Sequence, residues 1–187
     1  MQKIVHSGGA KGSDSLFSNI FIEYNYRVIH HSFKGHNVNA KTGEILIHST
    51  SELEKNKQFL KKLCKQLKRN YPTQPYIEKL LLRNIFQIKD AELVIGVGQI
   101  SDPKNCVIDG GTGYGIMQAK LKKIPIVFFN QSEIQWYYSV NGEEFKKLNR
   151  QPKLFNFPNV FAAIGTRKSS VNTIKELKKV FQKRKNK

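Results

Sequence analysis

Short apolar runs alternate with amphipathic stretches along most of the chain. Runs of strand length, rich in β-branched and aromatic residues, lie at 3–6, 26–30, 91–97, 125–129 and 160–164. Apolar residues at helical spacing occupy five stretches: one that begins near residue 13, then 51–70 and 76–89, one that ends near residue 123, and 170–183. Short continuous apolar runs indicate buried strands, and a spacing of three to four residues indicates helices.

Strands that alternate with helices predict a parallel sheet with helices on both faces. We therefore expect an α/β fold, a Rossmann-like three-layer domain with a mostly parallel sheet of about five or more strands. The 187 residues fit a single domain, 1–187, which ends in a basic helix end and tail at 175–187.

Two segments lack a clear period. We expect residues 32–49 to form a long loop, and 130–158 to be irregular around Trp136, Tyr137 and Tyr138. These three aromatic residues are more typical of core or lid packing than of a base-stacking surface. Ser51 and Glu54 have the spacing of a capping box, which predicts the start of the helix at 51–70.

Composition narrows the class of protein. No apolar run reaches the ~18 residues of a membrane-spanning helix, so no membrane partner is expected. The N-terminal residues begin a strand pattern, which predicts that there is no secretory signal. Two cysteines, Cys64 and Cys106, are too few for a disulfide scaffold or a four-ligand zinc site and indicate a reduced, cytoplasmic protein. The net charge of +18 attracts polyanions, although lysine is enriched along the whole chain and fits a solvated surface equally well.

Two glycine-rich segments carry the candidate chemistry. Residues 7–14, SGGAKGSD, follow the first expected strand, and residues 109–115, DGGTGYG, lead into another helix. Glycine lets a backbone approach an oxyanion closely, and a helix N-terminus presents free N–H groups. Lys11 would add a point charge. Neither segment matches G-x-G-x-x-G or the P-loop pattern, so these motifs do not identify the ligand.

Four further side chains are candidates for the same sheet edge. Asp14 either stabilises its helix dipole or faces a ribose hydroxyl or a water. Arg83 and Asn84 lie on the helix before the central strand, as surface, capping or site residues. Arg167 follows the last strand, where a guanidinium can clasp phosphate. The predicted ligand-binding residues are Ser7, Gly8, Gly9, Ala10, Lys11, Gly12, Asp14, Asn84, Gly110, Gly111, Thr112, Gly113, Tyr114, Gly165, Thr166 and Arg167.

The histidines do not indicate a metal centre. His30, His31, His36 and His48 lack the spacing of known metal-binding motifs, so we expect neither a metal nor a bound cofactor.

Taken in order, four segments resemble the SLOG superfamily. They are SGGAKGSD at 7–14, LLRN at 81–84 with Asp90-Ala91, GGTGY at 110–114, and FAAIGTR at 161–167. The superfamily is a Rossmann-like group that contains the Lonely Guy (LOG) phosphoribohydrolases, DNA-processing protein A and molybdenum-cofactor carrier-like proteins. The set resembles uncharacterised phage and microbial members more closely than the named enzymes. The resemblance implies a nucleotide-type ligand over the sheet edge and, in many members, a homodimer.

The sequence departs from the LOG pattern at the catalytic position. LOG enzymes carry P-G-G-x-G-T-x-x-E, whereas here Asp109 replaces the proline and Met117 stands at the glutamate position, beside Gln118. The resemblance places Arg83 at the family arginine. Asp14 and Arg83 are then the candidate catalytic residues if hydrolysis occurs.

Three functions follow from these observations. The first is a nucleotide sensor or sequestering protein without turnover. The second is an N-glycosidic hydrolase of nucleoside phosphates, with one carboxylate near the ribose and cations on the phosphate. The third is a DNA- or RNA-binding protein that uses the basic helix at 51–70 and the tail after Lys175.

Overall fold

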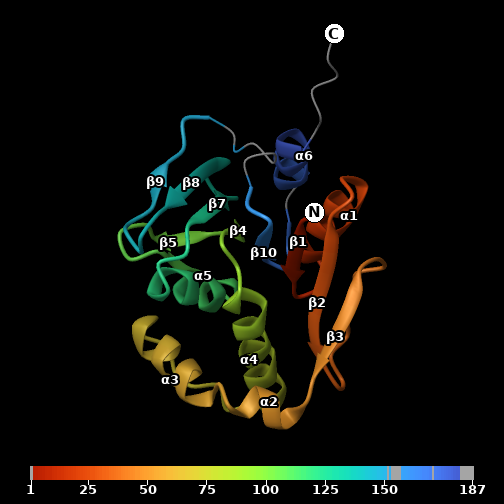
Figure 1. The fold of residues 1–187 in the computed structure, drawn as a ribbon. Helices are drawn as coiled ribbons and strands as arrows, with labels where there is room; N and C mark the ends of the chain where they lie inside the picture. Colours follow the sequence, from red (N-terminus) through yellow and green to blue (C-terminus); the bar gives the residue numbers. More distant parts are fainter. Residues whose placement is uncertain (1, 151, 153–156, 170, 182–187) are drawn as a thin grey trace.

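An eight-stranded sheet forms the middle of the molecule (Figure 1). The structure is a computed structural model that describes residues 2–150, 152, 157–169 and 171–181. The strand order is β3-β2-β1-β10-β4-β7-β8-β9, and all neighbours from β3 to β7 are parallel. The strands are β1 (Ile4–Ser7), β2 (Arg27–Phe33), β3 (Glu44–His48), β4 (Val94–Gly98), β7 (Ile126–Asn130), β8 (Gln135–Ser139), β9 (Lys146–Lys147) and β10 (Val160–Gly165). Two short strands, β5 (Ile100–Asp102) and β6 (Val107–Ile108), form a separate antiparallel pair.

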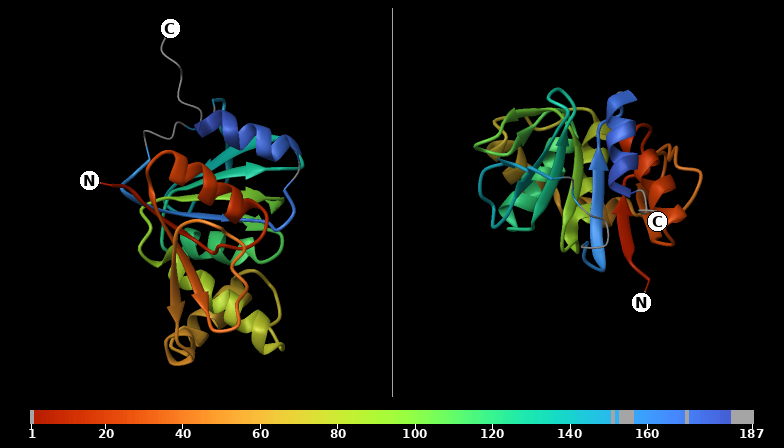
Figure 2. Two further views of the ribbon diagram at one scale, coloured as in Figure 1. Left: turned by 90° about the vertical axis from the view of Figure 1, so that its right-hand side faces the viewer. Right: turned by 90° about the horizontal axis from the view of Figure 1, so that it is seen from above.

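Helices cover both faces of this sheet, so the expected three-layer, Rossmann-like α/β fold is confirmed (Figures 1 and 2). One face carries α1 (Ser13–Glu23) and α6 (Val171–Phe181). The other carries α4 (Pro75–Lys89) and α5 (Thr112–Leu121), with α2 (Thr50–Glu54) and α3 (Lys57–Gln66) on their outer side. No helix of the described residues is both long enough and apolar enough to cross a membrane.

The sheet separates two apolar cores. On the α1 side, Phe17 and Phe21 pack against Phe161 of β10. On the α5 side, Ile116 packs with Phe128 of β7. Strand β4 lies between these cores and is buried along its whole length, as expected for a central parallel strand.

The order of the strands reverses at the centre of the sheet. From β1 the chain continues to β2 and β3 on one side, whereas β4 and β7 lie on the other, with β10 between β1 and β4. In open α/β sheets, the carboxyl ends of the strands at such a reversal form a crevice. The segments after β1 and β10 therefore meet at this point.

The two segments without a clear period contain strands, so those expectations were wrong. Within 32–49, β3 pairs with β2 as a parallel edge strand. Within 130–158, β8 turns back on β7 and pairs with β9. Trp136 and Tyr137 are buried in opposite cores, which confirms core packing for these two residues. The strands were missed because β3 exposes apolar side chains on both faces and β8 joins β7 through a four-residue turn.

The capping box was predicted two residues too late. Ser49, not Ser51, caps α2: its side chain accepts from the Glu52 amide, and its own amide donates to Glu52 Oε2 at 2.7 Å. The expected helix at 51–70 is also broken, because α2 ends at Glu54 and α3 begins at Lys57. The expected end of the last helix near residue 183 and the rest of the basic tail, 182–187, lie outside the described residues.

Candidate functional site

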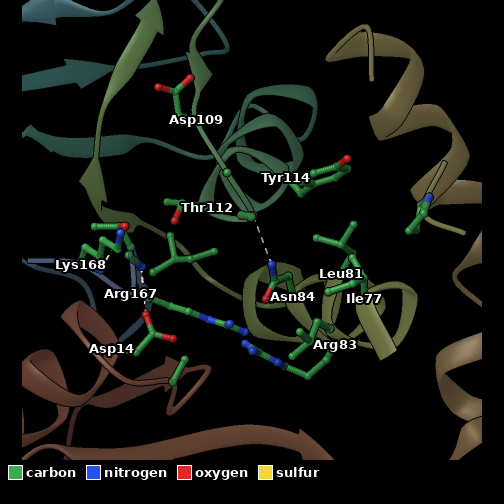
Figure 3. A pocket seen from close by; sticks show the side chains of 18 of the residues that line it. Asp14, Ile77, Leu81, Arg83, Asn84, Asp109, Thr112, Tyr114, Arg167 and Lys168 are labelled. Atoms are coloured by element: carbon green, nitrogen blue, oxygen red, sulfur yellow. Dashed lines mark hydrogen bonds between the residues drawn. The ribbon is translucent and has the colours of Figure 1, made fainter. Parts of the chain in front are cut away.

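A pocket of about 630 Å³ opens at the carboxyl ends of the central strands (Figure 3). It is bounded by the start of α1, by α4, by the turn before α5 and by the segment after β10. The lining residues are Ala10, Asp14, Asn70, Pro72, Ile77, Leu80, Leu81, Arg83, Asn84, Asp109, Gly110, Gly111, Thr112, Tyr114, Ile164, Gly165, Thr166, Arg167 and Lys168.

Asp14 lines one side of this pocket. Its side chain is buried, and Oδ1 accepts a hydrogen bond from the Gly165 amide at 2.9 Å. Burial raises the pKa of Asp14 to about 6, against the opposing effect of the Arg83 charge and of the amides of Gly165, Ala10 and Gly8. Asp14 is thus mainly ionised at neutral pH, and its orientation is fixed by backbone donors.

Two arginines point toward each other beside this carboxylate. Arg83 comes from α4 and Arg167 from the segment after β10, and their guanidinium groups approach across the pocket (Figure 3). Burial lowers the pKa of Arg83, Asp14 raises it, and the charge of Arg167 lowers it further. Two cations facing one carboxylate leave an excess of positive charge in the pocket, which an anion would balance.

Arg83 is held by a chain of hydrogen bonds that reaches the sheet. Its Nη1 donates to Gln87 Oε1 at 2.9 Å, and Gln87 Nε2 donates to the Ala163 carbonyl at 2.6 Å. The Arg83 Nε is buried and has no hydrogen-bond partner. Buried unpaired N–H groups are rare in proteins.

The first glycine turn is enclosed by protein. The Gly9 carbonyl accepts from the amides of Asn39 and Ala40, and the Ser13 amide donates to the Thr166 carbonyl. A Cβ on Gly8 would clash with Arg83 and lie 2.7 Å from Asp14 Oδ2. The absence of a side chain at Gly8 therefore allows Arg83 and Asp14 to approach the backbone.

The second glycine turn opens toward the pocket, and Arg69 holds it from behind. Arg69 donates to the carbonyls of Ile108 and Gly110 at 2.7 and 2.8 Å, and its guanidinium lies over the Tyr114 ring. Asn84 Nδ2 donates to the Gly111 carbonyl at 3.4 Å (Figure 3). Sequence reasoning missed Arg69, because nothing distinguished it among 32 lysines and arginines.

We expect Gly113→Ala to destabilise the protein by about 3 kcal/mol, because the new Cβ would clash with the Ile108 carbonyl oxygen, which is backbone. Gly111→Ala is the matched control, since a Cβ added there would meet no heavy atom within 4 Å and its φ is −67°. Urea unfolding of both variants measures the difference. Equal stabilities would contradict the close packing of this turn.

The structure brings together most of the residues that the sequence singled out. Eleven of them line the pocket: Ala10, Asp14, Arg83, Asn84, Gly110, Gly111, Thr112, Tyr114, Gly165, Thr166 and Arg167. Six lie outside the lining: Ser7, Gly8, Gly9, Lys11, Gly12 and Gly113. Sequence reasoning did not predict Lys168, Ile77, Leu80 or Leu81 as ligand-binding residues, because side chains of these types occur throughout the chain.

The residues at the LOG glutamate position face the core. Met117 and Gln118 are buried, and neither lines the pocket. Gln118 Nε2 donates to the Ile85 carbonyl at 2.9 Å, which ties α5 to α4. In the described part of the chain, no group of three or more histidine, cysteine or acidic side chains could hold a metal ion.

Comparison with protein-family models, with curated proteins and with solved structures found no match to this chain. The resemblance to the SLOG superfamily therefore stays a prediction, and the site has to be interpreted from its own geometry.

Proposed function

We propose that the protein binds a nucleotide, or a nucleotide derivative that carries a phosphate, in this pocket, and that it acts as a sensor or sequestering protein. The observation that carries the proposal is the approach of Arg83 and Arg167 beside a single buried carboxylate. A phosphate between the two guanidinium groups would balance their positive charge.

The remainder of the pocket suits the rest of a nucleotide. Thr112 begins α5, and its side chain faces the pocket, so the helix N-terminus also favours an anion (Figure 3). The side chains of Ile77, Leu80 and Leu81 give α4 an apolar wall for a flat base. A pocket of about 630 Å³ is within the range of small-molecule sites.

Calorimetric titration with nucleoside monophosphates, diphosphates, triphosphates and NAD tests this proposal. At ~0.15 M salt, Arg167→Ala should lower the affinity for the nucleotide by roughly 10- to 100-fold, which is the usual cost of losing one charged hydrogen bond. Arg150→Ala removes the same charge from an exposed position outside the pocket and should leave the affinity within about twofold. Failure of the whole panel to bind, or equal losses in both variants, would count against the proposal.

A second candidate is hydrolysis of the N-glycosidic bond of a nucleoside phosphate. The observation in its favour is Asp14, a buried carboxylate fixed by the Gly165 amide beside the pocket, with its pKa raised to about 6. An ionised carboxylate there would stabilise an oxocarbenium-like ribose, while water adds to the anomeric carbon and the base leaves with a proton.

Chromatography of the free base separates binding from hydrolysis. If the protein is a hydrolase, Asp14→Asn should abolish base release, whereas Asp109→Asn should retain it, because Asp109 is an exposed carboxylate at the rim of the same pocket. No free base from any substrate with the unmodified protein would rule out this second candidate and leave the binding proposal in place.

Nucleic-acid binding stays a prediction from charge. The lysines of α3 and its flanks are exposed on the outer side of that helix: Lys55, Lys61, Lys62, Lys65 and Lys68. Retention of single-stranded DNA or RNA at ~0.2 M salt would favour this role, since weak binding at low salt is expected of any protein of this charge.

A further inference from the structure

Strand β3 forms an edge of the main sheet and exposes three consecutive apolar side chains. Ile45, Leu46 and Ile47 are 54%, 46% and 64% exposed. Among the described residues β3 pairs only with β2, and no element lies beyond it (Figure 1). Unpaired edges of this kind are usually protected by lysine, proline or a bulge. Strand β3, EILIH, contains no lysine or proline.

We propose that β3 pairs antiparallel with β3 of a second copy of this chain, so that the two sheets join across a twofold axis. Pairing centred on Leu46 places Leu46 opposite the partner's Leu46, and Ile45 opposite the partner's Ile47. Side chains alternate along a strand, so the four isoleucines then lie together on one face of the joined sheet. Each exposed apolar side chain of the strand thus gains an apolar neighbour.

The charges around β3 also favour pairing with itself in this direction. The chain carries a net charge of +18, yet residues 42–54 contain no lysine or arginine and three glutamates. Lys41 precedes the strand, and Glu52 and Glu54 follow it, all exposed. Antiparallel pairing brings the start of one strand to the end of the other, so Lys41 approaches the partner's Glu52. The segment is therefore complementary to its own copy, although the molecule as a whole repels itself.

Glu44 does not oppose the pairing, because its charge is already balanced. The Arg27 guanidinium donates to both carboxylate oxygens of Glu44, at 2.7 and 2.8 Å. This pair lies at the start of the strand and opposite the partner's His48 in the proposed register. No like charges face each other along the five residues of the strand.

Analytical ultracentrifugation of the full chain tests the proposal. We expect a dimer at micromolar concentration that tightens as salt rises from about 0.05 to 0.5 M, because salt screens the overall repulsion. The variant Ile45→Lys/Ile47→Lys should be a folded monomer, since both side chains are exposed. The variant Ile134→Lys changes an apolar side chain that is 50% exposed on another surface and should remain dimeric.

A cysteine on the proposed axis fixes the register. Leu46→Cys should form an intermolecular disulfide under mild oxidation, because directly opposed Cβ atoms of antiparallel strands lie about 5 Å apart. Val140 is 40% exposed on the native protein, and Val140→Cys should not form such a disulfide. The native Cys64 and Cys106 are buried. A monomer at ~100 μM, a dimer that the double lysine variant leaves intact, or association lost at high salt would each overturn the proposal.

Discussion

Arg83→Met should cost about 3–5 kcal/mol of the free energy of unfolding at pH 7, because it removes the buried cation whose charge stabilises the Asp14 carboxylate. Methionine fills most of the same volume, so the loss reports the missing charge rather than a cavity. Urea unfolding at pH 7 measures it. Arg150→Met, at an exposed position, is the matched control and should change stability by less than about 0.5 kcal/mol.

A second substitution should restore part of the stability that Arg83→Met loses. Asp14→Asn added to Arg83→Met should recover a large part of the lost stability, because no buried charge then lacks a partner. The double-mutant cycle should give a coupling of about 2 kcal/mol or more between the two side chains. Additive losses would show that Arg83 acts through packing alone and would remove the electrostatic basis of the proposed site.

Acidification from pH 7 to pH 5 should remove about 2 kcal/mol or more of stability, through the histidines rather than the carboxylates. Burial lowers the pKa of all five histidines, to about 3 for His31 and about 4 for His36. The unfolded chain takes up protons as the pH falls through 6.5, whereas the folded chain takes up fewer, because its histidine pKa values are lower. The contribution of the histidines to the free energy of unfolding is therefore fully present above pH 6.5, and it is lost as the pH falls toward their pKa values in the folded state.

The geometry behind this prediction is a row of three imidazoles. His6 Nδ1 and His31 Nε2 are 2.9 Å apart, and His31 Nδ1 and His48 Nε2 are 2.8 Å apart. Each contact needs one protonated and one bare nitrogen, so neutral rings satisfy both. The positive charges of His6, His48 and Arg83 further lower the pKa of His31. A protonated His31 would donate at both nitrogens, so both neighbouring rings would have to present a bare nitrogen to it.

The titration of Asp14 changes stability in the opposite direction, and the value of about 2 kcal/mol already includes its effect. Its pKa is about 6 when folded and about 3.8 when unfolded, so the folded state gains a proton first and becomes relatively more stable as the pH falls between these values. One such group offsets only part of the effect of five histidines.

Unfolding curves at half-unit pH steps test the histidine prediction. His31→Gln should reduce the loss between pH 7 and pH 5 by about 2 kcal/mol, one proton's share, even if the variant is less stable throughout. Lys61→Gln places the same side chain on the exposed side of α3 and should keep the full slope. A stability that stays flat from pH 7 to pH 5 in the unmodified protein would contradict the prediction.

The parts of the fold that the sequence predicted are those buried on both faces. β4, β7 and β10 are continuous apolar runs because helices cover both sides of the sheet there. β3 and β8 were missed for opposite reasons. β3 is apolar but exposed, and β8 buries Trp136 and Tyr137 in a segment whose polar flanks resemble a loop.

The sequence predicted most residues of the candidate site but not the long-range contacts that hold them. Glycines before α1 and α5 identified the turns, and Arg167 was found because it directly follows a strand. The burial of Arg83 and its approach to Asp14 depend on α4 crossing the sheet edge, which local spacing does not encode. Arg69, some 40 residues from the turn that it holds, has the same explanation.

The position of β10 determines when this domain can be completed. The strand is the last of the sheet along the chain, yet it fills the gap between β1 and β4 at its centre. During synthesis, the earlier strands leave the ribosome with two interior edges that have no neighbour, until residues 160–165 arrive. A nascent chain that stalls before Val160 would expose both edges to aggregation. The amide that holds Asp14 and the arginine that faces Arg83 arrive with the same segment.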